Sequence, residues 1–263
     1  AGSEAARALY LPGIIDGSII ATIPQRDSTP LTLQAIDGED RLQGDLQFVP
    51  SGGTASHVLA PIQHDHENHW AMIDLSQQGA SRVAYKTHDG RHGAHITVDL
   101  LYDDGWIVLS GTDADAATQA LYARAMLVAA AEGVGAMQGA LDSTVEYTRQ
   151  REQFGQSLSS FQALQHRMAE MLIQTELARS LVLAACRAWD TQADNASTLA
   201  LVAKAKVDAA ARSVTQEAVQ MHGGIATTNE YKVGHYFKRM ALLESRPQHR
   251  YALIAEFIQR RQG

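Results

Sequence analysis

The sequence predicts an α+β protein in which an antiparallel β domain precedes a helical bundle. Between residues 18 and 112, short apolar runs alternate with Asp-Gly, Gly-Gly and Gly-Asp pairs, a pattern typical of strands joined by tight turns. From residue 113 to 263, long segments rich in Ala, Leu, Val and Met keep helical spacing. With 263 residues, 45% of them hydrophobic, the chain is long enough to bury two cores.

Composition narrows the class of protein. The net charge of −7 argues against nucleic acid as the main partner, because neutralising phosphates needs a basic surface. The single cysteine, Cys186, excludes an internal disulfide and suits a reducing compartment. No apolar run approaches the roughly 18 residues of a membrane span, and no signal peptide opens the chain. We therefore expect a soluble, cytoplasmic protein that binds neither nucleic acid nor membranes.

The β domain is predicted from apolar runs of strand length. Residues 64–69 carry three histidines and two acidic side chains between two such runs, but nothing supplies a matching second cluster of ligands. We interpret this stretch as a hairpin loop and expect no metal. The runs cover residues 19–23, 31–36, 42–49, 58–62, 70–75, 82–85, 94–98 and 106–109.

Four helical segments are predicted in the second half of the chain. They cover residues 118–150, 161–189, 198–222 and 231–259, the last interrupted by Pro247. Long helices with many small residues are typical of a bundle that also packs against other subunits. We expect most of the Met and Ala positions to be core.

Residues 149–171 read as a helix end, a tight turn and a new helix. Gly155 stands where a C-cap glycine belongs, because only Gly adopts the left-handed conformation without steric cost. Ser159 and Gln162 match a capping box that would begin the next helix. Arg151 would then lie beside a helix N-terminus, a good place to hold a pyrophosphate. The alternative is an ordinary helical hairpin without a ligand.

This segment resembles the R-x-x-F-G…F-Q-x-x-Q-H signature of the acyl-CoA dehydrogenase family. Gln220-Met221-His222-Gly223-Gly224, with residues 227–231 after it, resembles that family's Q-x-H-G-G-x-G-Y-x-x-E-Y stretch. The resemblance is good from Thr118 to about Arg239 and loose in the first hundred residues. It implies three parts: residues 1–17 as the remnant of an otherwise largely absent N-terminal helical domain, 18–112 as the β domain, and 113–263 as a C-terminal four-helix bundle domain.

The resemblance also implies FAD as the cofactor, with its isoalloxazine ring in the β domain. Here the match weakens. The family's flavin-contacting strand, L-T-E-P-x-A-G-S-D, is replaced by residues 21–27, ATIPQRD, and the next element by residues 46–53, LQFVPSGG. Pro24 and Ser51 match the family pattern, but the hydroxyls and the aromatic side chain that would pack on the flavin ring are mostly absent. We therefore expect that this chain does not hold the ring in its own β domain.

A carboxylate base is also missing from the positions where the family places it. Counting from Gly224, the usual position is Pro247; counting back from Arg151, the alternative position is Ala125. Neither side chain can accept a proton. Glu244, three residues before Pro247, is a weak candidate if the loop is rearranged, so we expect no catalytic residue in this chain otherwise.

The retained residues correspond to family positions that reach a neighbour's FAD across a subunit interface. The hypothesis is a non-catalytic-type subunit of a heteromeric, steroid side-chain type acyl-CoA dehydrogenase, which we expect to form an α2β2 heterotetramer with a homologous subunit. By resemblance, the substrate is an acyl-CoA and the electron acceptor is electron-transferring flavoprotein. The expected cofactor-binding residues are Arg151, Gln153, Phe154, Leu158, Gln162, Gln220, Gly223 and Gly224.

Three other interpretations stay open. A self-sufficient homo-oligomeric flavoenzyme would use Glu244 or another carboxylate as the base. A structural or regulatory subunit would bind no flavin even in a complex. An oxidase or monooxygenase on the same fold would differ only in details of its pocket.

Overall fold

The computed structural model describes residues 2–26, 28–246 and 248–262. The chain divides into two compact units, Ala1–Leu121 and Tyr122–Gly263, and helix α2 (Gly111–Gln150) runs through the boundary. The predicted division at residues 17 and 112 into three functional parts stays a prediction.

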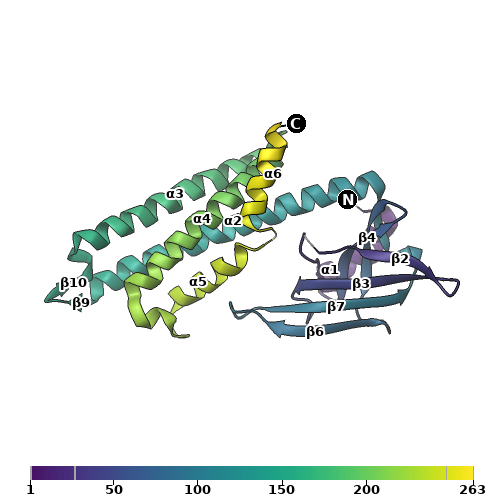
Figure 1. Ribbon diagram of the computed structural model, residues 1–263, viewed down its shortest axis with the longest axis horizontal. Coiled ribbons are helices and arrows are strands. Elements are labelled where there is room, and N and C mark those ends of the chain that lie inside the picture. Colours follow the sequence, from purple (N-terminus) through teal and green to yellow (C-terminus); the bar gives the residue numbers. More distant parts are fainter. Residues whose placement is uncertain (1, 27, 247, 263) are drawn as a thin grey trace. The chain divides into compact units, whose positions relative to one another are not determined.

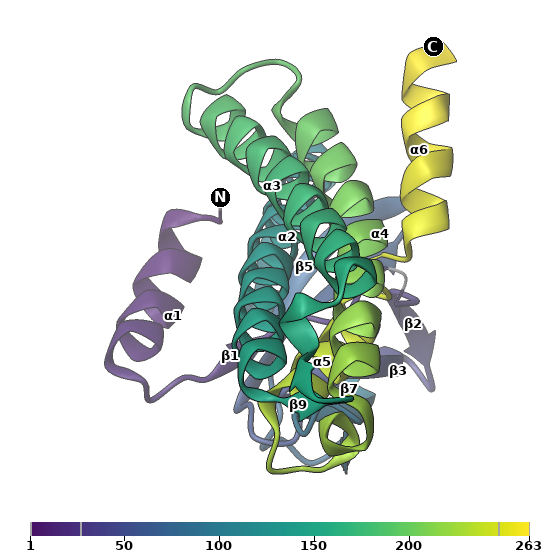
Figure 2. The same cartoon turned by 90° about the vertical axis from the view of Figure 1, so that its left-hand side faces the viewer.

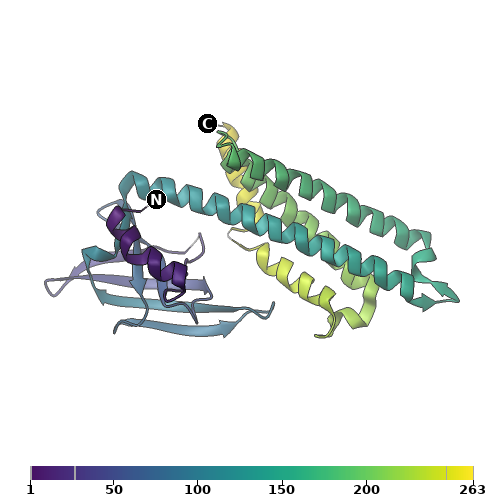
Figure 3. The ribbon, with the colours of Figure 1, turned by 180° about the vertical axis from the view of Figure 1, so that it is seen from behind.

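The first unit is built on one eight-stranded sheet (Figures 1 and 3). Seven strands follow the order β6-β7-β3-β2-β4-β5-β8, and β1 pairs with β4. Most pairs are antiparallel as predicted, but β1 and β2 both pair with β4 in parallel, so the sheet is mixed. Its elements are α1 (Glu4–Asp16), β1 (Ala21–Thr22), β2 (Leu31–Ile36), β3 (Glu39–Pro50), β4 (His57–His64), β5 (Glu67–Asp74), β6 (Ala80–Lys86), β7 (His92–Leu101), η1 (Asp104–Trp106) and β8 (Ile107–Ser110).

Alternation along β3 and β7 separates a core face from a polar face. Leu42, Leu46 and Ile96 are fully buried. On the other face, Asp99 accepts hydrogen bonds from Arg41 Nε at 2.9 Å and from Gln43 at 3.0 Å. The apolar face therefore forms the core of this unit, while cross-strand polar pairs cover the opposite face.

The histidine-rich stretch is the predicted hairpin. His64 of β4 pairs with Glu67 of β5, and the two turn residues, Asp65 and His66, both have positive φ. Within residues 2–26, 28–246 and 248–262, no group of three or more His, Cys, Asp or Glu side chains is placed to hold a metal ion.

The second unit is a helical bundle whose helix positions agree with the prediction (Figure 2). α2 begins seven residues earlier than expected. The last predicted helix is two helices, and the break between them contains Pro247, which lies outside the described residues. The remaining elements are β9 (Glu152–Gln153), β10 (Gln156–Ser157), η2 (Leu158–Ser160), α3 (Gln162–Asp190), α4 (Ala196–His222), η3 (Gly223–Thr227), α5 (Lys232–Leu243) and α6 (Arg250–Gln262).

Small residues let the helices of this bundle approach closely. A Cβ built on Gly133 of α2 would lie 2.4 Å from Val207 Cγ1 of α4, and one on Gly139 would lie 2.6 Å from the Tyr236 hydroxyl of α5. Met137 and Ala203 are fully buried in the same core. The predicted core role of the Ala and Met positions is thus confirmed for these helices.

One pair of charges is buried in the bundle. Lys204 has no exposed surface, and its ammonium group donates to both carboxylate oxygens of Asp208, at 2.7 and 2.6 Å, and to the Leu243 carbonyl at 2.9 Å. Burial lowers the pKa of Lys204 and raises the pKa of Asp208 to about 7. Lys204 therefore connects α4 to the last residue of α5.

α2 is, by length and composition, apolar enough to cross a membrane, although no membrane span was predicted from the sequence. The core helix of a globular bundle passes the same test, and α2 buries Met137 and Ala140 in its own bundle. Its buried Thr144 and Thr148 donate to carbonyls four residues earlier, at 2.7 and 2.9 Å.

Candidate functional site

The first sequence motif contains the predicted end of a long helix, at Gln150, and the predicted tight turn, which is a two-residue β-hairpin. After α2 ends at Gln150, β9 and β10 pair antiparallel, with Phe154 and Gly155 as the turn between them. Their φ angles are 55° and 80°, as in a type I′ turn. The left-handed conformation predicted for Gly155 is confirmed, but its role as a helix C-cap is wrong.

The predicted capping box is also wrong. The short helix η2 follows the hairpin, and α3 begins only at Gln162, after Phe161 as N-cap without a side-chain capping bond. The Ser159 hydroxyl lies 3.0 Å from that of Ser157. The Ser159 carbonyl instead accepts a hydrogen bond from Gln165 Nε2 at 2.9 Å. Arg151 therefore precedes a hairpin, and an extra turn of 3₁₀ helix separates that hairpin from α3.

The side chains of the first motif are mostly exposed. Phe154 is 91% exposed at the tip of the hairpin, with its ring edge-to-face to Phe161 at a centroid distance of 6.3 Å. Arg151, Gln153 and Gln162 are exposed, and Leu158 is half-buried. An exposed aromatic ring on a tight hairpin is a feature of binding surfaces. The hairpin region thus exposes a guanidinium group, two side-chain amides and one aromatic ring on its surface.

The second motif ends α4 in a glycine turn. Gly223 has φ 68° and ψ −147°, which an L-residue with a Cβ rarely adopts. A Cβ at Gly223 or Gly224 would meet no atom within 4 Å, so both glycines border open space. Gln220, one turn earlier on α4, is exposed. A ligand or a second chain can therefore approach this backbone closely.

An aromatic cluster that was not predicted from the sequence brings the two motifs together. The ring of His222 stacks on Tyr147 at 4.4 Å between centroids and lies 5.1 Å from Tyr231. The Tyr147 carbonyl accepts the Arg151 N–H at 2.8 Å. His222 is 4% exposed, and its Nδ1–H donates to the Ala218 carbonyl at 2.7 Å. We call Tyr147, His222 and Tyr231 the aromatic clamp. The hairpin of β9 and β10 and the end of α4 lie at the same end of the bundle (Figure 1).

Two of the three clamp residues lie in the second motif, where the sequence could have indicated them. His222 precedes the glycine pair, and Tyr231 closes the matched stretch. Tyr147 lies one helical turn before Arg151, which places it near the end of α2. Only the tertiary structure pairs the rings.

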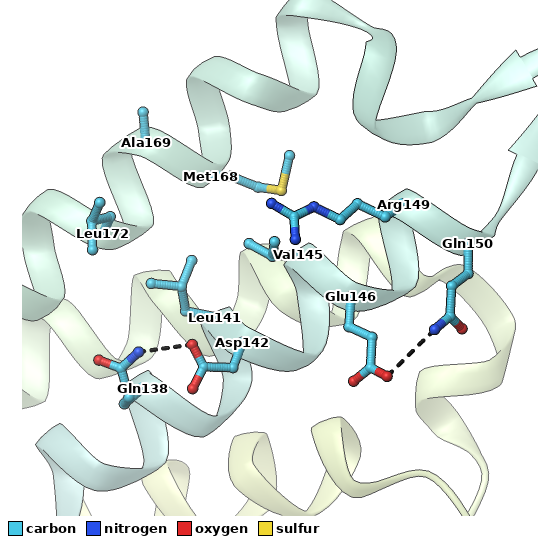
Figure 4. A pocket seen from close by; sticks show the side chains of 10 residues that line it. All are labelled: Gln138, Leu141, Asp142, Val145, Glu146, Arg149, Gln150, Met168, Ala169 and Leu172. Atoms are coloured by element: carbon cyan, nitrogen blue, oxygen red, sulfur yellow. Dashed lines mark hydrogen bonds between the residues drawn. The ribbon is translucent and has the colours of Figure 1, made fainter.

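A groove of about 650 Å³ between α2 and α3 adjoins the hairpin (Figure 4). Val145 and Met168 line it from the two helices, and Arg149 extends toward Met168. Polar pairs border it on α2, with Gln138 donating to Asp142 at 2.8 Å and Gln150 donating to Glu146 at 3.4 Å.

Glu244, the weak candidate for a base, is buried beside an arginine. It is 5% exposed, and its Oε2 accepts from Arg212 Nε at 2.9 Å and from Nη2 at 2.5 Å. The guanidinium therefore neutralises the carboxylate. This ion pair, on α4 and the end of α5, belongs to the bundle and not to the cluster around Arg151.

Comparison of the sequence with known protein families identifies the family to which the chain belongs. The sequence model of the acyl-CoA dehydrogenase C-terminal domain matches residues 114–245, which is half of the chain. The chain belongs to the acyl-CoA dehydrogenase family. The matched part contains both motifs and the aromatic clamp.

Two relatives show the range of similarity. The acyl-CoA dehydrogenase IpdE2 of Mycolicibacterium smegmatis is 45% identical over 121 residues, covering 46% of this chain and 37% of that protein. The short-chain specific acyl-CoA dehydrogenase of Megasphaera elsdenii is 29% identical over 257 residues, covering 90% and 66%. The chain thus spans less than two thirds of the length of either relative.

Solved structures agree with the predicted fold. The steroid acyl-CoA dehydrogenase Tcur3481–Tcur3483, as its G363A variant, matches with a TM-score of 0.84 and 26% identity, over 98% of this chain and 71% of that chain. The ChsE4–ChsE5 complex from Mycobacterium tuberculosis matches with a TM-score of 0.82 and 23% identity, over 94% and 67%. The α+β acyl-CoA dehydrogenase fold predicted from the sequence is confirmed.

FAD is the cofactor of this family, and the residues around the clamp fit its ADP part. Arg151 offers exposed, permanently charged donors for a pyrophosphate. Gly223 and Gly224 leave room where side chains would otherwise project. The roles predicted for these and for the other six cofactor residues stay predictions.

At neither of the two positions where the resemblance to the family places the catalytic base does this chain have a side chain that can accept a proton. Ala125 is half-buried on α2, and Pro247 lies outside the described residues. In the β unit, the Thr22 hydroxyl donates to the Pro50 carbonyl at 2.5 Å, so it already serves a contact within the chain. Asp27, the last residue of segment 21–27 that replaces the family's flavin-contacting strand, lies outside the described residues.

Proposed function

We propose that this chain is a subunit of an FAD-dependent acyl-CoA dehydrogenase that completes the ADP and pyrophosphate part of the FAD site at a subunit interface. In this proposal a homologous partner supplies the isoalloxazine site and the catalytic base. The reaction class is α,β-dehydrogenation of a CoA thioester. Bound FAD would supply the hydride acceptor for that reaction.

One observation carries the proposal. The cation of Arg151 and the open backbone of Gly223–Gly224 lie at the same end of the bundle, held by the aromatic clamp, while the two family positions for a base carry Ala125 and Pro247. The features retained are those that would bind a cofactor, and the features lost are those that would carry out proton abstraction.

The residues of this chain would bind and orient the cofactor. The planar guanidinium of Arg151 would donate to pyrophosphate oxygens, and the glycine turn would let backbone approach them. Phe154 would pack against the cofactor and exclude water. Gln162 and Gln220 would hydrogen-bond the adenosine part, with Gln153 and Leu158 completing the surface.

The substrate class and the partners come from the relatives. Tcur3481–Tcur3483 is a steroid acyl-CoA dehydrogenase, and ChsE4–ChsE5 is a complex from Mycobacterium tuberculosis. We extend both properties to this chain: a steroid side-chain CoA ester as substrate, and an α2β2 heterotetramer with a homologous subunit. Electron-transferring flavoprotein as electron acceptor and a cytoplasmic location complete the proposal.

The rival with Glu244 as base has less support. Its carboxylate is paired with Arg212 on one oxygen and lies in the bundle, so a substrate would have to compete with a charge-assisted contact. The other rival hypothesis is a structural subunit that binds no flavin. It would not explain why Arg151 is exposed or why the turn at Gly223 has room for a ligand.

The test is flavin content with and without the partner. The chain would be expressed alone and then with its homologous genomic neighbour, and bound FAD measured by visible absorbance of each purified protein. We expect a colourless chain alone and a flavin-containing complex. Flavin and dehydrogenase activity in the chain alone would overturn the proposal in favour of Glu244, and a colourless complex would favour the structural subunit.

Arg151→Ala in the complex tests the assigned contact. Removing a charge-assisted hydrogen bond should weaken FAD binding by roughly tenfold to a hundredfold, without loss of helical content. Arg149→Ala is the matched control, because Arg149 is also exposed at the end of α2 but faces the groove. Equal FAD affinity in Arg151→Ala and wild type would contradict the role of Arg151.

A further inference from the structure

The outer face of α3 carries large apolar side chains that the described part of the chain leaves exposed. Leu172, Ile173, Leu177 and Leu183 are 48%, 55%, 53% and 62% exposed, while the opposite face of the same helix packs into the core of the bundle. α3 runs along the outside of the bundle in Figures 1 and 3. Because a soluble chain rarely leaves several large apolar side chains exposed on one helix, this face is a candidate interaction surface.

Grooves border this face on both sides. Leu172 lines the groove between α2 and α3 described above, and Ile173 lines a second groove of about 300 Å³ between α3 and α4. A helix that stands as a ridge between two grooves has the shape that another helix packs against, since ridges of one helix fit into grooves of the other. The surface therefore suits a helical partner.

The order of large and small side chains along α3 indicates which helix fits. Ile173, Leu177, Ser180 and Ala184 are all exposed and follow helical spacing along one face. The two large residues come first and the two small ones last. If a second α3 lies antiparallel, with the axis of symmetry between residues 178 and 179, Ile173 lies opposite Ala184 of the second copy and Leu177 lies opposite Ser180. Each large side chain then meets a small one, as close packing requires.

Charges and flanking leucines agree with the same register. Glu170 and Arg187 are both exposed, near the two ends of this face, and the antiparallel arrangement brings Glu170 of one copy toward Arg187 of the other. A parallel arrangement would place like charges together, which is unfavourable. Leu172 and Leu183, eleven positions apart, lie on one flank of the helix, so Leu172 of one copy approaches Leu183 of the other.

A surface that complements itself about a twofold axis is the mark of an isologous contact. We propose that two copies of this chain associate through an antiparallel α3–α3 contact centred between residues 178 and 179. The contact is separate from the hairpin and from the glycine turn. Within the α2β2 heterotetramer it would join the two copies of this chain, and this last step alone rests on the proposed function.

The test is the mass of the chain alone in solution, without a partner subunit or flavin, by analytical ultracentrifugation. We expect a dimer. Leu177→Glu should raise its dissociation constant about a hundredfold or more, because each dimer would bury two added carboxylates. Val83→Glu is the matched control, since Val83 is 69% exposed on β6 and should leave the dimer intact.

Three outcomes would overturn the proposal: a monomeric chain, a chain that associates only with the homologous subunit, or equal effects of Leu177→Glu and Val83→Glu. These outcomes are distinct from a failure of the proposed function, which is judged by flavin content. Circular dichroism of Leu177→Glu should match that of the wild type, because Leu177 is half exposed and its replacement leaves the core unchanged.

Disulfide cross-linking tests the register without disturbing the contact. In a Cys186→Ser background, Leu177→Cys and Ser180→Cys would be prepared as two separate proteins and then mixed under mild oxidation. We expect the mixture to form covalent dimers faster than either protein alone, because only the pair of positions 177 and 180 lies directly across the axis. Faster cross-linking within either single variant would contradict the proposed register.

Discussion

His222 lies where the two sequence motifs meet. Its imidazole is stacked on Tyr147 and buried, and burial lowers its pKa below the ordinary 6.5 despite the hydrogen bond to the Ala218 carbonyl. The ring is therefore neutral near pH 7, with the proton on Nδ1. The sequence identified Arg151, Gly223 and Gly224 through motif matches, but a ring stack between α2 and α4 is a tertiary contact that no local pattern encodes.

Protonation of His222 should destabilise the folded chain. Because the folded pKa is below the unfolded one, the unfolded state binds the proton first, and the free energy of unfolding falls as pH drops below about 6.5. His222→Phe keeps an aromatic ring without the titration, so its stability should change less between about pH 7.5 and about pH 5. Urea unfolding at the two pH values measures this; an identical pH dependence in both proteins would exclude His222 as its source.

At the scale of elements, the sequence located the helices well and the connection between α2 and α3 poorly. Helical periodicity is long-range and redundant, so α3 and α4 begin and end within two residues of their predicted limits. The two-residue hairpin requires a positive φ at Phe154, which sequence rules disfavour for a bulky residue. The left-handed glycine, Gly155, was therefore predicted to be a helix C-cap and not part of a hairpin turn.

Close helix approach at Gly133 gives a prediction with an internal control. Gly133→Ala would place a Cβ 2.4 Å from Val207 Cγ1, so the helices must shift, at a cost of about 1–3 kcal/mol. Gly135→Ala, on the same helix but with no atom within 4 Å of the added Cβ, should stabilise by about 0.5–1 kcal/mol. Thermal unfolding should therefore move in opposite directions for the two variants. A shift in the same direction would mean that α2 and α4 do not meet at Gly133.

At the scale of the molecule, the pair Lys204–Asp208 shows what composition cannot reveal. Both residues have the spacing of an ordinary surface ion pair on a helix, four positions apart, and no local pattern predicts that they are buried. The fold places them where α4 passes the end of α5. The Lys204 ammonium group therefore donates hydrogen bonds both to Asp208 of α4 and to the last carbonyl of α5. Burial of this kind depends on the crossing of helices and not on any single segment.

Removing one member of this pair should destabilise the whole bundle. Lys204→Met leaves the Asp208 carboxylate buried without its partner, and we expect the free energy of unfolding to fall by about 3–5 kcal/mol. The double variant Lys204→Met, Asp208→Leu removes both charges and should recover most of this loss. Chemical denaturation of the two proteins measures the difference. A double variant as unstable as the single one would show that the loss comes from packing and not from the unpaired charge.

The type I′ turn under Phe154 has a kinetic consequence. Because the turn fixes the backbone on both sides of the exposed ring, the entropy of ordering this projection is lost when the chain folds and not when a second molecule arrives. Encounter with a complementary surface then needs only correct orientation, without a slow rearrangement of the loop. Assembly at this hairpin should accordingly proceed in one step, at a rate that scales with the concentration of the second molecule.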